Sequence, residues 1–400
     1  MISDRRIVIT GFGVAASNGI GKERFFENCR RGVLGIRKAD IYPVEQLRTS
    51  YFGQADIPLP CTPQEPYEES RMEWLMEKAL KEMFQDGRFS SEEMEKLGPK
   101  ASVFCGSLLG TTSRFMGYTQ KCMEGKDAGG WIERESQYLY WLQKNVGVRG
   151  GVYACEAACA SGTTALGMAY DFLKEGICDM AVAGGTDPLT EVGAAGFHVL
   201  KALSCGITNP MDQNRDGINI GEGSAFFLME TMESAQKRGV PVYAEILGYG
   251  LNNDAYHVTS PDPDGSGAKA SMKMALEEGG IAPDQIDYIN AHGTGTALND
   301  AMESKAVQSL FPKGVHMNST KALTGHCMGA SGAVELAAIL LMMGHQLLFP
   351  MPHLETKLEE GQGININSDS EPCVIEYALS NSFAFGGNTA SLLIGKGGSV

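Results

Sequence analysis

Cys159 is the residue in this sequence best placed to act as a nucleophile. A short apolar run with strand character ends in the small-residue turn 158–162, and a helical pattern follows as far as Gly176. Unpaired amide groups and the positive end of the helix dipole stabilise a thiolate at a helix start. We therefore predict that the Cys159 thiol ionises more easily than a free thiol. Cys155, on the expected strand, is predicted to be a buried core residue.

Two histidines and a lysine in the second half of the chain could complete this chemistry. His292 lies in a glycine-rich turn after a strand candidate, and Lys321 and His326 follow another. The carboxyl ends of strands in an α/β sheet are where ligands bind. A thiolate that accepts an acyl group, with imidazoles that manage charge and protons, suits acyl transfer. The cysteines and histidines show no zinc-site spacing, and we expect neither a metal nor a cofactor.

The elements that must position these residues occur twice along the chain. A strand pattern closed by Gly-aromatic-Gly recurs, and three further patterns recur in the same order. The paired segments are 6–13 with 242–250, 103–106 with 287–293, 150–176 with 315–343, and 181–185 with 382–387. Alternating strands and helices indicate an α/β fold, and repeats in register indicate an internal duplication. We expect one half at 1–240, which carries the cysteine, and one at 241–400, which carries the histidines and the lysine.

Composition and charge narrow the class of protein. The chain has 400 residues, 43% of them hydrophobic and 20% charged, which is ordinary for a globular protein with a large core. Its formal net charge of −15 argues against nucleic-acid and anionic-membrane surfaces. The N-terminal apolar run is too short for a signal peptide, and the apolar helix candidate at 333–343 is too short to span a membrane. We predict a cytoplasmic protein whose ten cysteines are reduced thiols.

The stretch Gly11–Ala16 matches the dinucleotide fingerprint G-x-G-x-x-A. The residues Ser17-Asn18-Gly19 interrupt the place where a phosphate-binding helix would continue, and no ribose-binding acid follows at the usual distance. We therefore expect a tight turn here, where the backbone passes close to another segment. A dinucleotide-dependent oxidoreductase is the alternative that rests on this stretch.

These motifs together resemble the β-ketoacyl-acyl carrier protein synthases of the elongating (synthase II) type, which have the thiolase fold. The resemblance covers nearly the whole chain. Its motifs are Ala-Cys-Ala-Ser-Gly at 158–162, Asn-Ala-His-Gly-Thr-Gly-Thr at 290–296, Ser-Thr-Lys-Ala-Leu-Thr-Gly-His at 319–326 and Asn-Ser-Phe-Ala-Phe-Gly-Gly at 381–387. It implies a duplicated α/β fold in the form of a five-layered αβαβα sandwich.

The resemblance also implies a role for each matched residue. Cys159 would accept the acyl chain, and the backbone amides of Cys159 and Phe385 would form the oxyanion hole. His292 and His326 would support decarboxylation of the malonyl thioester, with Lys321 holding the cluster through Glu335. Phe385 would be a gate on a mobile Gly386-Gly387 loop, with Thr259 as its neighbour. Asp300 and Glu303 would either orient the His292 turn or be simple acids at a helix start.

Partners follow from the same resemblance. It implies acyl- and malonyl-loaded acyl carrier proteins, and a homodimer or a heterodimer with a chain-length partner; a coenzyme A-dependent thiolase-type acyltransferase is the alternative. Carrier proteins are acidic, and the candidate cations for docking are Arg71, Arg114, Lys121, Lys126 and Lys201. Three departures from the family pattern, at Asn388-Thr389, 122–142 and 203–212, point to a specialised chain builder of the polyketide or polyene type.

Overall fold

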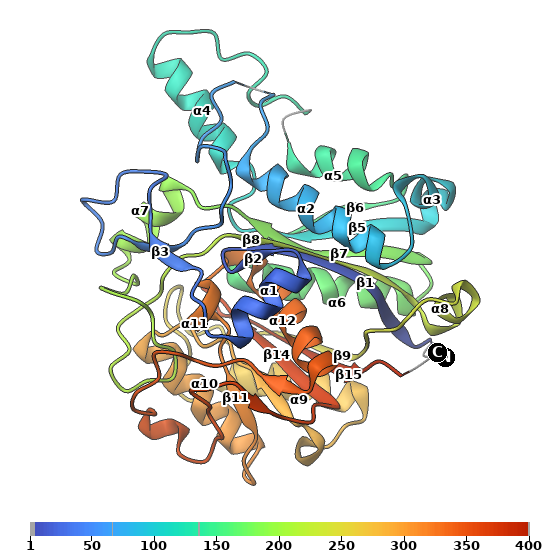
Figure 1. Ribbon diagram of the computed structural model, residues 1–400, viewed down its shortest axis with the longest axis vertical. Coiled ribbons are helices and arrows are strands. Elements are labelled where there is room, and N and C mark those ends of the chain that lie inside the picture. Colours follow the sequence, from blue (N-terminus) through green and yellow to red (C-terminus); the bar gives the residue numbers. More distant parts are fainter. Residues whose placement is uncertain (1–4, 66, 135–136, 399–400) are drawn as a thin grey trace.

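The computed structural model describes residues 5–65, 67–134 and 137–398, which fold into five alternating layers of helices and sheet (Figure 1). Helices α2 and α5 cover the first sheet half, α6 and α12 lie in the middle, and α9 and α10 cover the second sheet half. Their bounds are α2 (Arg71–Asp86), α5 (Tyr138–Val146), α6 (Ser161–Lys174), α12 (Ser331–His345), α9 (Ser266–Gly279) and α10 (Ala297–Leu310). The expected αβαβα sandwich is confirmed.

Each half of the sheet repeats one topology. The strands run in the order β6-β5-β7-β8-β1 in the first half and β11-β10-β14-β15-β9 in the second, and β1 pairs with β9 at the centre. Their bounds are β1 (Ile7–Ala16), β5 (Ala101–Gly106), β6 (Val152–Cys155), β7 (Met180–Asp187), β8 (Gly223–Thr231), β9 (Ala244–Asn253), β10 (Tyr288–Asn290), β11 (His316–Asn318), β14 (Tyr377–Phe383) and β15 (Asn388–Lys396). The four repeated segments fall on equivalent strands: β1 with β9, β5 with β10, β6 with β11 and β7 with β14.

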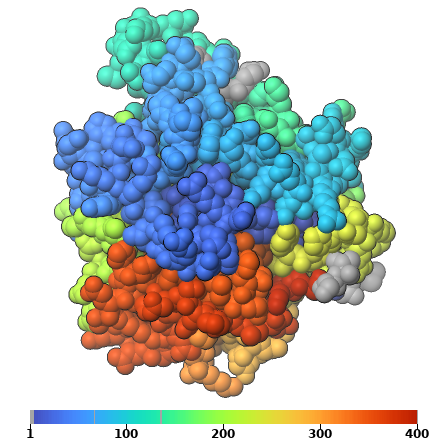
Figure 2. Space-filling view, in the orientation of Figure 1, coloured from blue at the N-terminus to red at the C-terminus, as the bar shows by residue number. Residues whose placement is uncertain are grey.

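Further elements surround the layers. Figure 2 shows that α4 and the chain around it stand out from the rest of the molecule. The further elements are α1 (Lys22–Arg30), α3 (Ser91–Lys96), α4 (Thr112–Met123), α7 (Glu191–Val199), α8 (Met232–Arg238), α11 (Lys321–Thr324), β2 (Gly19–Ile20), β3 (Ile36–Lys38), β4 (Tyr51–Gly53), β12 (Leu347–Leu348) and β13 (Glu371–Pro372).

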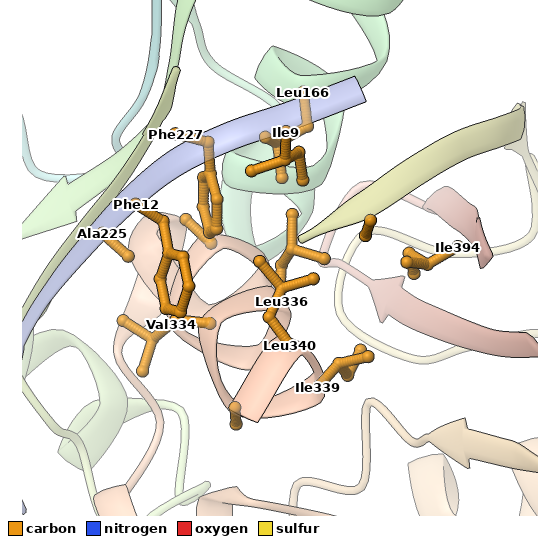
Figure 3. Packing of buried hydrophobic residues seen from close by; sticks show 14 of the residues in the cluster. Ile9, Phe12, Leu166, Ala225, Phe227, Val334, Leu336, Ile339, Leu340 and Ile394 are labelled. Atoms are coloured by element: carbon orange, nitrogen blue, oxygen red, sulfur yellow. The ribbon is translucent and has the colours of Figure 1, made fainter. Parts of the chain in front are cut away.

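Helix α12 forms the centre of the largest hydrophobic core. It packs against side chains from both halves of the sheet, such as Phe12, Phe227 and Ile394 (Figure 3). The stretch Met328–His345 is apolar enough to cross a membrane by composition, but 83% of it is buried inside the molecule. A helix that is apolar on all sides and enclosed by sheet on both sides is a core helix.

The glycines of the dinucleotide-like stretch lie inside a strand, so the expected turn at Gly11–Ala16 is wrong. Strand β1 continues to Ala16, pairs with β8 along its length, and packs its glycines against α2. A Cβ on Gly13 would lie 2.1 Å from the Ala79 carbonyl oxygen, and one on Gly11 would lie 2.5 Å from the Gly87 nitrogen. These glycines serve close packing of strand and helix rather than binding of a phosphate.

Candidate active site

Cys159 lies in a strained turn between β6 and α6. The 3-10 turn Ala158–Ala160 begins with Ala158 at φ 49°. The second half repeats this turn at Met328–Ala330, before α12, where Met328 has φ 53°. Non-glycine residues with positive φ are uncommon and are typical of functional turns. The two turns pack against each other, since a Cβ on Gly162 would lie 2.9 Å from the Gly329 carbonyl oxygen.

The structure brings Cys159 together with His292 and His326 from the other half. One sulfur or ring-nitrogen atom from each of these three buried side chains lies within 4.8 Å of the others. The two imidazole rings are 5.5 Å apart and nearly perpendicular. The duplication explains the meeting, because each half contributes the carboxyl ends of its parallel strands to the same place.

Hydrogen bonds fix where the proton sits on His326. Its Nδ1 accepts from the Met328 amide at 3.1 Å and lies 2.8 Å from the Ser331 hydroxyl. A nitrogen that accepts from an amide carries no proton, so the neutral ring holds its proton on Nε2. Burial, together with the charge of Lys321, lowers the pKa of His326 well below its usual value. His326 therefore offers a neutral Nε2–H donor to the site.

His292 is also neutral with its proton on Nε2, but a different contact sets the position of that proton. The ammonium of Lys321 lies 3.4 Å from its Nδ1 and also pairs with the buried carboxylate of Glu335. Because an ammonium group can only donate, Nδ1 of His292 accepts and its proton lies on Nε2. Burial, with Lys321 and His326 nearby, lowers the pKa of His292 well below its usual value. Both imidazoles are thus neutral N–H donors close to Cys159.

Asp300 and Glu303, on α10, hold the turn that carries His292. Glu303 accepts hydrogen bonds from the amides of His292 and Gly293, both at 2.9 Å. Asp300 accepts from Gly295 at 3.2 Å and from the Met211 amide at 2.9 Å. Burial raises the pKa of Glu303 to about 7 and also raises that of Asp300. Of the two interpretations left open by the sequence, these contacts favour orienters of the His292 turn.

The expectation that the Cys159 thiol ionises easily is wrong. Burial raises its pKa to about 12, and the nearby ammonium of Lys321 opposes this only in part. The loss of hydration in an enclosed pocket therefore outweighs the favourable charges around the sulfur. The resting site holds a thiol, not a thiolate. Cys155 is buried in the core, as predicted.

A cavity of about 400 Å³ leads from the surface to Cys159, and the expected gate lines it. Phe385 stacks on Phe197 of α7 with ring centroids 5.8 Å apart. Gly386 and Gly387 follow at φ 83° and 78°, values that favour glycine. Thr259 lines the same cavity. The expected gate thus consists of one stacked ring and a glycine pair, beside the cavity that reaches Cys159.

Hydrogen bonds tie the Phe385 loop to the neighbouring loop at 253–259. The Gly386 amide donates to the Val258 carbonyl at 2.8 Å, and the Asn253 side chain donates to the Gly386 carbonyl at 2.7 Å. Asn388, one of the departures from the family pattern, accepts from Asn253 at 3.2 Å. Within the described residues, no acceptor meets the Phe385 amide.

Two of the five candidate cations are neither docking residues nor solvated surface residues, because they are buried. Arg71 is fully buried and pairs with Glu222, and Arg114 pairs with the buried Glu73. Lys126 is exposed, but it pairs with Glu124 at 2.7 Å, and Lys121 lies on α4 away from the cavity lining. Lys201 is exposed and lines the cavity. The sequence does not distinguish these lysines and arginines, because their surroundings come from distant segments.

Sequence reasoning missed Ser331 and Asn381, which support the two histidines. Ser331 lies beside His326, and the Asn381 side chain donates to Glu303 at 3.2 Å. The duplication carried a signal for Ser331, which occupies the position after the turn that Ser161 has in the first half. Asn381, within β14, is the first residue of the motif at 381–387, but no role of its own was assigned to it from the sequence.

The proton positions also bear on metal binding. The distances in space between the Cys159 sulfur and the ring nitrogens of His292 and His326 would suit a metal ion. A metal needs the lone pair of a ring nitrogen, yet both Nδ1 atoms accept hydrogen bonds and both Nε2 atoms hold protons. The residues present do not fit a metal, and the neutral N–H donors suit a developing negative charge on oxygen.

Two family models and a curated relative all match this chain to β-ketoacyl synthases. The model of the beta-ketoacyl synthase N-terminal domain matches residues 4–235, and that of the C-terminal domain matches residues 243–355. The 3-oxoacyl-[acyl-carrier-protein] synthase 2 of Staphylococcus aureus (strain COL) is 32% identical over an alignment of 419 positions, gaps included, that covers 99% of each chain.

Solved structures show the same fold. The ishigamide ketosynthase/chain length factor superposes with a TM-score of 0.89 at 26% identity and covers 98% of this chain and 100% of its own. A type II polyketide ketosynthase, in complex with its acyl carrier protein and bound to a hexaketide, superposes at 0.88 with 28% identity over 98% and 99% of the two chains.

Proposed function

Because the chain belongs to the β-ketoacyl synthase family, we propose that it is an elongating β-ketoacyl-acyl carrier protein synthase. It would join an acyl group held on Cys159 to a malonyl unit, with loss of carbon dioxide. The observation that carries the proposal is the convergence of one thiol and two neutral Nε2–H donors from opposite halves of the fold. The Cys159 thiol and this donor pair match the two chemical steps required.

In the first step, the Cys159 sulfur attacks the carbonyl carbon of an acyl thioester on a carrier protein. The amides of Cys159 and Phe385 stabilise the oxyanion of the tetrahedral intermediate. The carbon–sulfur bond to the carrier then breaks, and the carrier thiol leaves with the proton that Cys159 gives up. Since the acyl-enzyme forms before the second substrate reacts, the kinetics are ping-pong.

In the second step, a malonyl thioester loses carbon dioxide, and the electron pair of the broken carbon–carbon bond forms an enolate. The Nε2–H groups of His292 and His326 donate to the enolate oxygen, where the charge develops. The enolate carbon attacks the acyl carbonyl on Cys159, a carbon–carbon bond forms, and the bond to sulfur breaks. The released thiolate takes one proton from solvent, which restores the resting thiol.

The two halves divide this work. We assign the nucleophile to residues 1–240, and the donor pair, Lys321 and the Phe385 gate to residues 241–400. Rotation of Phe385 away from Phe197 would open the acyl pocket, with Gly386 and Gly387 as the moving backbone. No cofactor takes part in either step.

The cavity mouth is the proposed landing site for the carrier protein. Lys201 lines it, as do Leu200 and Leu298, which are 48% and 60% exposed, and Val258, 72% exposed, lies on the adjacent loop. The net charge of −15 makes the long-range interaction of the chain as a whole with an acidic carrier repulsive. Apolar contact around Lys201 is therefore the main attraction at the mouth.

We propose a dimer across β6, the strand at the end of the first sheet half. Gly151, just before β6, and Cys155 accept hydrogen bonds from the β5 side, so in the alternating ladder the amide and carbonyl of Ala154 point outward from the sheet. Strand edges of this kind pair with a second chain unless they are protected. The partner is a second copy or a chain-length subunit.

Fatty-acid and polyketide enzymes both occur among the relatives, and the proposed reaction is the same in both. The specialised pathway remains a proposal based on Asn388 and on the segment 122–142, of which residues 135–136 lie outside the described part. Within the described segment, Trp131 is buried against Gly117 of α4. We place the reaction in the cytoplasm.

The proposal predicts that Cys159→Ala abolishes the acyl-enzyme. The purified protein is incubated with acyl-acyl carrier protein, and intact-mass spectrometry should show an acyl adduct on the wild type and none on the variant. Cys155→Ala is the matched control, because that thiol is also buried but lies outside the site. A persisting adduct on Cys159→Ala would overturn the assignment.

A further inference from the structure

Asp187 is a buried carboxylate that the reaction above does not use. It ends β7, and its side chain is fully buried. Burial raises its pKa to about 6, while four hydrogen bonds oppose the shift. In the described part of the chain, no lysine, arginine or histidine forms an ion pair with it. A buried charge without a cation is costly, so these four donors are what keep it in place.

The four donors come from two segments that border the reaction centre. One oxygen of Asp187 accepts from the Ser107 hydroxyl at 2.7 Å and the Leu109 amide at 2.9 Å. The other accepts from the Leu108 amide at 2.9 Å and the Gly329 amide at 2.6 Å. One carboxylate therefore joins the loop after β5, in the first half, to the turn before α12, in the second.

The Gly329 contact leads directly to His326. The preceding residue, Met328, has a strained φ of 53° and donates its amide to Nδ1 of His326. The turn has no spare room, because a Cβ on Gly329 would lie 2.5 Å from the Leu108 nitrogen and 2.8 Å from an Asp187 oxygen. Holding Gly329 thus holds the amide that decides which His326 nitrogen carries the proton.

The same charge acts on Cys159 in the opposite sense. The negative charge of Asp187 contributes to the raised pKa of the Cys159 thiol, after the larger effects of burial and Lys321. A residue whose only role was to activate the nucleophile would lower the pKa of the Cys159 thiol rather than raise it. The carboxylate of Asp187 thus supports the turn beside His326 but disfavours ionisation of the Cys159 thiol.

We propose that Asp187 is a positioning residue that holds the His326 turn against the Ser107–Leu109 loop, and so supports decarboxylation but does not assist acyl loading. This inference rests on the proposed function for its kinetic consequence. Its structural consequence, the proton position on His326, stands without it.

The test uses Asp187→Asn, in which an amide NH₂ replaces one oxygen and must face two of the four donors. Malonyl-carrier decarboxylation, measured as carbon dioxide release, should fall about 10- to 100-fold towards the level of His326→Ala. Alkylation of Cys159 by iodoacetamide at the same pH should be at least as fast as in the wild type. Unchanged decarboxylation, or an equal fall in both rates, would overturn the proposal.

Glu230→Gln is the matched control, because Glu230 is a fully buried acid at the other end of the same strand pair, opposite Met180. It should leave both half-reactions within about twofold, and a loss like that of Asp187→Asn would show a merely structural effect. If Asp187→Asn does not fold, Ser107→Ala removes a single donor and should lower decarboxylation a few-fold with alkylation intact.

Nitrogen-15 NMR of labelled histidine separates this proposal from the function itself. The wild-type protein should show His326 with an unprotonated Nδ1, and Asp187→Asn should show a mixture of tautomers or a shifted Nδ1 signal. An identical His326 signal in the variant would overturn the positioning role. A wild type that releases no carbon dioxide would instead overturn the proposed function, while the NMR result would still decide the role of Asp187.

Discussion

At the scale of residues, the reaction centre depends on groups that decide where protons sit. The Met328 amide and the Lys321 ammonium each occupy an Nδ1 atom, so both histidines present Nε2–H. Burial keeps both rings neutral and keeps Cys159 as a thiol. In the proposed reaction, this neutral donor pair would stabilise an enolate without first neutralising a charge.

The raised pKa of Cys159 predicts its alkylation behaviour. Below a pKa of about 12 the thiolate fraction grows about tenfold per pH unit, so the iodoacetamide rate should rise steadily from about pH 7 to about pH 10. Mass spectrometry of the peptide that contains Cys159 gives the rate. Free cysteine is the control and should level off above about pH 8.5. A plateau for Cys159 at or below that pH would contradict the prediction.

At the scale of elements, each half packs one helix tightly onto the glycines of its first strand. Gly11 and Gly13 of β1 face α2, and Gly248 and Gly250 of β9 face α9 in the same way. A Cβ on Gly250 would lie 2.0 Å from the Ser271 carbonyl oxygen. The repeated Gly-aromatic-Gly pattern is therefore a packing feature that both halves share.

This packing predicts that Gly13→Ala destabilises the protein. The added Cβ overlaps the α2 backbone, which cannot rotate away, and the cost should be roughly 1–3 kcal/mol or more in free energy of unfolding. Urea unfolding followed by circular dichroism measures it. Gly344→Ala, in α12 with no atom within 4 Å of the new Cβ, is the control and should be neutral or stabilising. Equal stability of the two variants would refute the packing argument.

At the scale of the whole molecule, the two equivalent halves meet to form a site that neither half contains on its own. The nucleophile turn and its counterpart at Met328–Ala330 meet in the middle layer, where the donor pair reaches Cys159. The sheet leaves β6 as the outer strand of the first half. The same duplication thus provides both an enclosed reaction centre and an edge for a partner chain.

The dimer proposal predicts that Ala154→Pro yields a monomer. Proline removes the outward amide of β6 but leaves its bonds to β5, so the fold should survive. Sedimentation velocity should show a dimer for the wild type and a monomer for the variant. Ala154→Thr keeps the amide and should remain dimeric. If Ala154→Pro sedimented as a dimer with the wild-type dissociation constant, the interface would lie elsewhere.

The sequence by itself determined the fold class, the duplication and the segments that carry Cys159, His292, Lys321 and His326. These follow from apolar periodicity, from turn residues and from patterns that recur in order, all of which are local. Resemblance then supplied the expected roles of Glu335 and Phe385, which no spacing would have indicated.

Only the tertiary structure decided the state of those residues. The pKa of Cys159, the proton positions on His292 and His326, the burial of Arg71 and the contacts of Asp187 depend on partners far away in the chain. Desolvation and hydrogen bonding act over a few ångströms in space, whatever the separation in sequence. A local pattern therefore shows which residues are reactive, and the packing of the two halves determines their charge and orientation.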